Sequence, residues 1–118
     1  MSDERWRNDP VSERVKALCD RIGQTLVFTL TGALQYSDVN SWMKKNALLL
    51  PDTDQIRRLD LARELYEYIA KRLNADRAKK WFIDSNVSYK KITPVRAIRS
   101  DQNRDVRASA VHVVNYEQ

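Results

Sequence analysis

The chain has 118 residues and a mass of 13.8 kDa, which is the size of one domain, or of one compact domain with a small appendage. Hydrophobic residues make up 42% of it and charged residues 31%, so a real core can form under a charged surface, and disorder throughout is not expected. A doubly wound nucleotide-binding fold or an α/β barrel needs a longer chain. With only two glycines and three prolines for turns, the sequence predicts an all-α fold.

Sites of thiol or metal chemistry have few residues to draw on. Cys19 and His112 are the only residues of their kinds, so neither an internal disulfide nor a Cys/His metal cluster can form. We therefore expect no metal, no cofactor and no enzymatic activity. No apolar run approaches the roughly 20 residues of a membrane span, and residues 1–9 lack the apolar core of a secretory signal. We expect a cytoplasmic protein without a membrane partner.

The formal net charge is +5, and it is unevenly distributed. Residues 71–107 contain eleven Lys and Arg against four Asp, which leaves 11 − 4 = +7 in this segment. An excess of this size attracts polyanions, either the phosphates of a nucleic acid or the acidic face of a protein. The alternative is that these bases only solvate the outer faces of helices.

The first predicted helix begins at Asp9-Pro10, where Asp9 can cap free amides and Pro10 suits the first turn. It ends at Gly23, and its apolar face is formed by Val11, Val15, Leu18 and Ile22. Two short helices follow, over residues 25–34 and 36–45, joined near Ala33 to Gln35, with Ser37 as an alternative cap for the second.

The segment 46–54 is predicted as a connector because Pro51 interrupts helix formation. A long helix then begins at a cap on Thr53 or Asp54, with apolar positions at Ile56, Leu59, Ala62, Leu65, Tyr66, Ile69 and Leu73. We expect a short helix over 76–82 and a loop over 83–91. Another helix begins at Thr93-Pro94, the cap and the first position, and continues to Arg99.

The last segment, from Arg104 onward, has two interpretations. Val106 and Ala110 fit a helix, whereas Val111, Val113 and Val114 are β-branched residues that favour a strand.

Residues 25–44 fit the template of a helix-turn-helix. Phe28, Leu34, Val39 and Trp42 take its four apolar positions, although the template expects a glycine at Ala33 and a bulky residue at Gly32. The outward face of the second helix would then consist of Gln35, Tyr36, Ser37, Asn40, Ser41 and Lys44. Amide side chains can pair with an adenine edge in the major groove, and Ser, Tyr and Lys can reach phosphates. The alternative is that these helices only pack a core.

The order of these elements resembles a known family. The helix-turn-helix ends in Val39-Asn40-Ser41-Trp42, and three motifs follow it: Arg57-Arg58-Leu59, Ala78-Lys79-Lys80-Trp81-Phe82 and Thr93-Pro94-Val95-Arg96-Ala97-Ile98. Over roughly residues 22–114 this order is similar to that of the Xre/MbcA/ParS antitoxin family. The resemblance implies an Xre-like helix-turn-helix region over 1–50 and a helical toxin-binding region over 51–118.

The function implied by the resemblance is that of an antitoxin in a type II toxin-antitoxin system. Family members bind a RES-domain toxin that degrades NAD, occlude its active site, and regulate their own operon through DNA binding. By position, the residues matching the toxin-binding domain are Trp81, Phe82, Asn86, Lys90, Thr93 and Pro94. Trp81 and Phe82 have an alternative role as core residues.

The end of the chain can also meet such a toxin. A cleft that binds the phosphates of NAD must present basic groups. Polar or acidic groups at the end of this chain can enter such a cleft and mimic the phosphate anion. The candidates are Asn115, Tyr116, Glu117 and Gln118. The expected partners are the cognate toxin, operator DNA, and a second copy in a homodimer or larger assembly. The alternative is a stand-alone helix-turn-helix transcription regulator or phage-type repressor.

Overall fold

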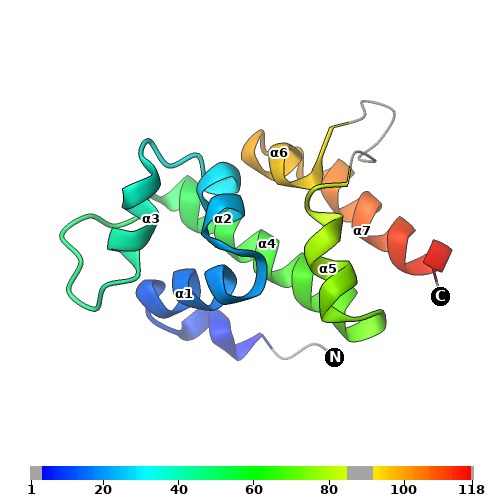
Figure 1. Cartoon of the computed structure of the whole chain (residues 1–118), viewed down its shortest axis with the longest axis horizontal. Coiled ribbons are helices and arrows are strands. Elements are labelled where there is room, and N and C mark those ends of the chain that lie inside the picture. The colour runs from blue at the N-terminus through cyan, green and yellow to red at the C-terminus, as the bar shows by residue number, and fades with distance from the viewer. Residues whose placement is uncertain (1–3, 85–91, 118) are drawn as a thin grey trace.

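The central element of the fold is the long helix α4, Thr53–Arg72, against which five other helices pack (Figure 1). The computed structural model describes residues 4–84 and 92–117. Asp52 caps α4, since its Oδ1 accepts from the Gln55 amide and its own amide donates to Gln55 Oε1, both at 2.8 Å. The predicted cap at Thr53 or Asp54 is therefore wrong by one or two residues, and the prediction of a long helix is confirmed.

The chain before α4 forms a short 3-10 helix η1, Arg5–Asn8, and α1, Val11–Ile22. The predicted end of α1 at Gly23 is confirmed, and this glycine has φ +94. The predicted start is wrong in detail: Pro10 rather than Asp9 holds the N-cap position, and no side chain caps the helix.

Two short helices follow, α2, Gln24–Thr31, and α3, Tyr36–Trp42. The prediction of two helices joined by a tight turn is confirmed. The cap of α3 is Gln35 rather than Ser37, and the Gln35 amide donates to Asp38 Oδ2 at 3.1 Å. The predicted connector between α3 and α4 contains no helix.

The chain after α4 forms α5, Ala75–Trp81, and α6, Pro94–Arg99. Asn74 caps α5, and its Oδ1 accepts from the Arg77 amide at 2.8 Å. Thr93 caps α6 and Pro94 takes the first position, as predicted; Thr93 Oγ1 accepts from the Arg96 amide at 3.4 Å. Of the predicted loop over 83–91, residues 85–91 lie outside the described part of the chain.

The last element is a helix, α7, Asn103–Glu117, which settles the choice between helix and strand. Its buried face consists of Val106, Ser109, Ala110, Val113 and Val114. These residues recur at spacings of three and four, so one helical face carries them all into the core, whereas a strand would divide them between two faces. Packing of this face outweighs the preference of β-branched residues for strands.

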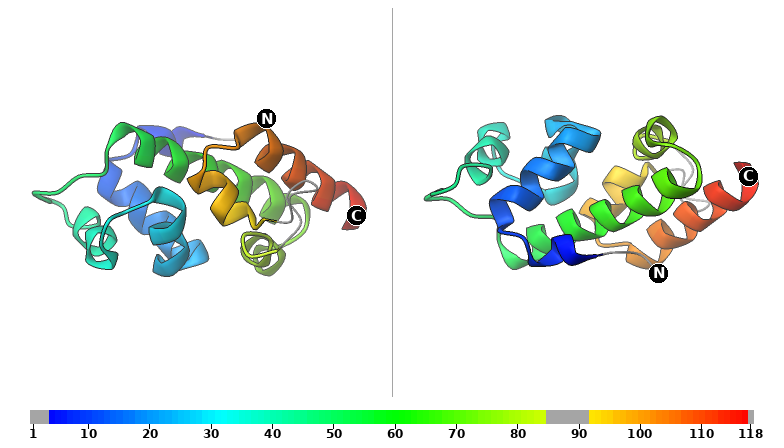
Figure 2. Two further views of the ribbon diagram at one scale, coloured as in Figure 1. Left: turned by 90° about the horizontal axis from the view of Figure 1, so that it is seen from above. Right: turned by 90° about the horizontal axis from the view of Figure 1, so that it is seen from below.

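All regular elements in the described residues are helices, which confirms the all-α class. One hydrophobic core runs through both halves of the chain, from Val15 of α1 and Trp42 of α3 to Trp81 of α5 and Val114 of α7. Figures 1 and 2 show α1, α2 and α3 at one end of α4, and α5 and α7 at the other. Within the described ranges, no helix combines the length and the apolar character that crossing a membrane requires.

Candidate functional site

The short helix α3 is held to the core by two side chains. Val39 and Trp42 are 0% and 2% exposed, as predicted, and α3 packs against α1 and α2. The other two predicted apolar positions differ: Phe28 is only half-buried, and Leu34 is 92% exposed. The predicted role of Leu34 as a buried turn residue is therefore wrong.

The difference arises from a shift of one residue in the register of the turn. Gly32 ends α2 in the left-handed conformation, at φ +77 and ψ +32, one residue before the position at which the turn glycine was expected. Ala33, at 8% exposure, then takes the buried place predicted for Leu34, and Val27 takes that of Phe28. The position of Gly32 was the signal in the sequence that could have revealed this register.

The six polar residues predicted to face a ligand do lie together on α3 and its flanks. Five are exposed and Ser41 is half-buried; the exposed ones are Gln35, Tyr36, Ser37, Asn40 and Lys44. The Tyr36 hydroxyl lies 3.3 Å from Thr25 Oγ1, and its ring packs on Phe28 with a centroid distance of 5.6 Å. Two amides, hydroxyls and a lysine are thus exposed on α3 and immediately beside its two ends.

Two other elements support the turn before α3. The Arg58 guanidinium of α4 donates to the Thr31 carbonyl at 3.0 Å, which satisfies one of the free carbonyls at the end of α2. Asp101, at the turn between α6 and α7, binds both Arg58 and Arg57 at 2.9 and 3.0 Å. Hydrogen bonds from Arg58 and then Arg57 lower the pKa of Asp101 to about 2. Local sequence patterns gave no signal for this long-range support.

The rear half of the chain places its predicted partner-contacting residues differently. Trp81 and Phe82 are 1% and 0% exposed, their ring centroids are 4.9 Å apart, and Trp81 Nε1 donates to Ser109 Oγ at 3.2 Å. Pro94 is also buried. All three side chains are thus part of the core, which is the alternative role expected of Trp81 and Phe82. Thr93 is half-buried and is used as the cap of α6.

The residues predicted at the end of the chain lie in the last turn of α7. Asn115, Tyr116 and Glu117 are exposed, Tyr116 at 82%, and Glu117 is paired with Arg77 at 2.8 Å. The remaining predicted contacts, Asn86, Lys90 and Gln118, lie outside the described residues. The described end of the chain is thus helical, and Figure 1 shows the C-terminal end of α7 at the opposite end of the molecule from α3.

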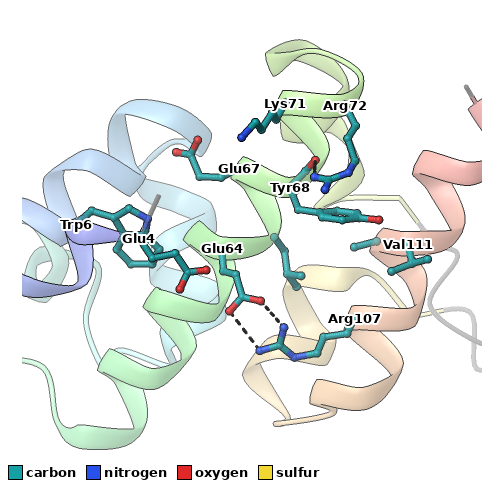
Figure 3. A pocket seen from close by; sticks show the side chains of 11 residues that line it. Glu4, Trp6, Glu64, Glu67, Tyr68, Lys71, Arg72, Arg107 and Val111 are labelled. Atoms are coloured by element: carbon teal, nitrogen blue, oxygen red, sulfur yellow. Dashed lines mark hydrogen bonds and ion pairs between the residues drawn. The ribbon is translucent and has the colours of Figure 1, made fainter. Parts of the chain in front are cut away.

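A groove with a volume of about 600 Å³ lies between η1, α4 and α7 (Figure 3). Its two central carboxylates are already paired, Glu64 with Arg7 and Arg107, and Glu67 with Arg21 and Arg63. Both carboxylates in the groove therefore have counter-charges within the protein.

The only cysteine and the only histidine lie on different helices, α1 and α7. Cys19 is half-buried on α1, and its pKa is raised to about 11 by burial and by the neighbouring Asp20. His112 is exposed on α7, 5.4 Å from the Tyr116 ring between centroids. In residues 4–84 and 92–117, no three His, Cys, Asp or Glu side chains come together as metal ligands would.

No family model matches the chain, and no curated protein or solved structure was found that is similar to it.

Proposed function

We propose that this chain is a DNA-binding regulator in which α3 lies in the major groove of its operator. The supporting observation is that Val39 and Trp42 anchor α3 while Asn40 stands exposed on the helix, Gln35 at its N-cap and Lys44 just beyond its C-terminal end. A recognition helix needs this combination, because base edges are read by side chains whose backbone is already fixed. Gln35 and Asn40 are assigned to base edges, and Lys44 to phosphate.

We further propose, on the resemblance stated above, that the regulator is the antitoxin of a RES-type, NAD-degrading toxin. The observation that favours this function over a stand-alone repressor is the position of Tyr116. It is 82% exposed beside Asn115 in the last turn of α7, and this end of α7 lies far from α3 (Figure 1), so a protein partner and DNA can be bound together. Inhibition is then occlusion of the toxin's cleft by the end of α7, without chemistry by this chain. Two copies would place two α3 helices about one DNA turn apart.

DNA binding is tested by selecting bound fragments from genomic DNA and measuring affinity by fluorescence anisotropy. Loss of a bidentate amide contact costs about 1–3 kcal/mol, so Asn40→Ala should weaken specific binding about 5- to 150-fold. Lys44→Gln should reduce the slope of log affinity against log salt by about 1. The matched controls are Asn115→Ala and Lys79→Gln, exposed residues of the same kinds outside the front half of the chain. Equal effects from the controls would refute the role of α3.

The antitoxin function is tested by co-expression with a RES-domain toxin encoded beside this chain's gene, with growth and cellular NAD as readouts. The chain should restore both. Deleting residues 115–118 should weaken this rescue while DNA binding persists. Undiminished inhibition by the deleted protein would show that the end of α7 does not contact the toxin. A chain that binds its operator but no toxin would be a stand-alone regulator.

A further inference from the structure

Six bases in the basic segment 71–107 have no carboxylate partner in the part of the chain that the structure describes. The other described bases of this segment are paired: Arg77 with Glu117, Lys80 with Asp76 and Arg107 with Glu64. The six unpaired bases form two groups along the chain, which are Lys71, Arg72 and Lys79 in the first, and Arg96, Arg99 and Arg104 in the second. We call the second group the α6 basic cluster; all three of its residues are exposed.

The acids closest in sequence do not neutralise the α6 basic cluster. Asp101 lies between Arg99 and Arg104 in the chain, but its carboxylate is bound by Arg57 and Arg58 of α4. Asp105 makes no ion pair with a described residue. Three guanidiniums close together along the chain are therefore free of ion pairs within the described residues, and against them stands the single unpaired carboxylate of Asp105; the remaining positive excess attracts an anion with several charges.

The α6 basic cluster is next to the turn that precedes α3. Helix α6 packs closely against α2, and the two lie side by side in Figures 1 and 2. The Arg99 side chain crosses Gly32, since a Cβ atom built on that glycine would lie 2.2 Å from Arg99 Nε. Arg96 is three residues before Arg99 and shares its face of α6. The Gln102 amide donates to the Ala97 carbonyl at 2.9 Å, which brings the chain back from α6 into α7, where Arg104 is the second residue.

The α6 basic cluster supplies positive charge near the N-terminal end of α3, where α3 itself has none. The lysines of the α3 region, Lys44 and Lys45, follow its C-terminal end, whereas its N-terminal turn carries Asp38. A helix in the major groove is held in register by phosphate contacts on both of its sides. The N-terminal side of α3 therefore needs a cation from another element. Arg99 can supply it, because its side chain lies over Gly32, four residues before the first residue of α3, Tyr36.

We propose that the α6 basic cluster binds the DNA backbone beside the groove that α3 enters, as a second, sequence-independent phosphate contact. This inference rests on the proposed DNA-binding function and adds a surface from the rear half of the chain to it. An acidic protein face is the other polyanion that such a cluster fits, and the position beside the turn before α3 favours DNA.

The test is the salt dependence of duplex binding by the full chain. The variant is R96Q/R99Q/R104Q, and the matched control is K71Q/R72Q/K79Q, which removes the same charge from the unpaired bases of the first group. Each phosphate contact contributes about 0.9 to the slope of log affinity against log salt, so the variant should lower the slope by about 2.7. Affinity should fall by the same factor for all duplexes, leaving the ratio of specific to non-specific binding unchanged.

A second variant separates charge from folding. R96Q/R104Q retains Arg99 over Gly32, and it should lower the slope by about 1.8 with an unchanged circular dichroism spectrum. If the control K71Q/R72Q/K79Q lowers the slope as much as R96Q/R99Q/R104Q, which we call the α6 triple, the effect is one of net charge and the inference is overturned. If the α6 triple binds duplex like the wild type while Asn40→Ala does not, the inference fails and the proposed function stands.

Three further outcomes are also decisive. If the α6 triple weakens duplex binding but Asn40→Ala and Lys44→Gln leave it unchanged, the phosphate surface stands and the proposed role of α3 is overturned. If the wild type binds no duplex at low salt, the proposed DNA-binding function and this inference both fail. Retained duplex binding together with loss of a co-purifying acidic protein would assign the cluster to that protein and overturn the inference.

Discussion

Gly32 gives the sharpest test of how the turn before α3 is built. Its φ of +77 suits glycine, and a left-handed conformation costs another residue about 1–2 kcal/mol. A Cβ there would also lie 2.2, 2.6 and 2.8 Å from Nε, Cζ and Cδ of Arg99. These atoms end a flexible side chain, so Arg99 can move aside at a cost of about 0.5–1 kcal/mol in lost contacts. Gly32→Ala should therefore lower the free energy of unfolding by about 2 kcal/mol.

A double-mutant cycle separates the two causes. In an Arg99→Ala background the alanine at 32 meets no guanidinium, so only the cost of φ remains, and the interaction energy should be about 0.5–1 kcal/mol. Gly23→Ala is the matched control, because Gly23 has φ +94 but no atom within 4 Å of an added Cβ. Its cost should be the same with or without Arg99.

The assay is urea unfolding followed by tryptophan fluorescence, with the thermal midpoint as a second readout. A loss of 1 kcal/mol corresponds to about 4 °C for a chain of this size. An interaction energy near zero between positions 32 and 99 would refute the packing of Arg99 on the turn. An equal interaction between positions 23 and 99 would show that the cycle reports a general effect.

Three further results are expected. The pKa of Asp101 is held at about 2 in the fold, so its contribution to stability is complete above its ordinary pKa of about 4 and is lost as pH falls toward 2. Asp101→Asn, in which asparagine tolerates the φ of +60 at this position, should flatten this part of the acid-unfolding curve. An unchanged curve would contradict the pairing with Arg58. Leu48 is fully exposed, so Leu48→Ser should change the free energy of urea unfolding by less than about 0.5 kcal/mol; a larger loss would place its side chain in a packed contact. Burial raises the pKa of Cys19 from 9.0 to about 11, so iodoacetamide at pH 8 should modify it about a hundredfold more slowly in the folded protein than in 8 M urea, and equal rates would refute its burial.

The helices of this protein could be predicted because their signals are local. The apolar spacing of α4 and the pair Thr93-Pro94 each act within a few residues, so the class of fold and most helix bounds followed from the sequence. The end of α7 could not be decided in this way. Its valines favour a strand in isolation, and the helix forms because their common face is covered by the rest of the core.

The residues of the candidate site were predicted in part. The exposed face of α3 followed from the positions of Val39 and Trp42, which set the opposite face of a helix. The turn before α3 was predicted one residue out of register, because Leu34 is more apolar than Ala33 and sequence alone favours burial of the larger side chain. The left-handed conformation of Gly32 determines instead which of the two enters the core.

The sequence by itself determined that the chain is helical, that its rear half carries excess positive charge, and that one short helix has a polar face. Tertiary structure alone decided which charged side chains remain without an ion-pair partner. Asp101 is bound by Arg57 and Arg58, some 43 residues away, and in the described residues Arg96, Arg99 and Arg104 are left without an ion-pair partner. Ion pairing depends on distance through space, so the order of charges along a chain cannot establish it.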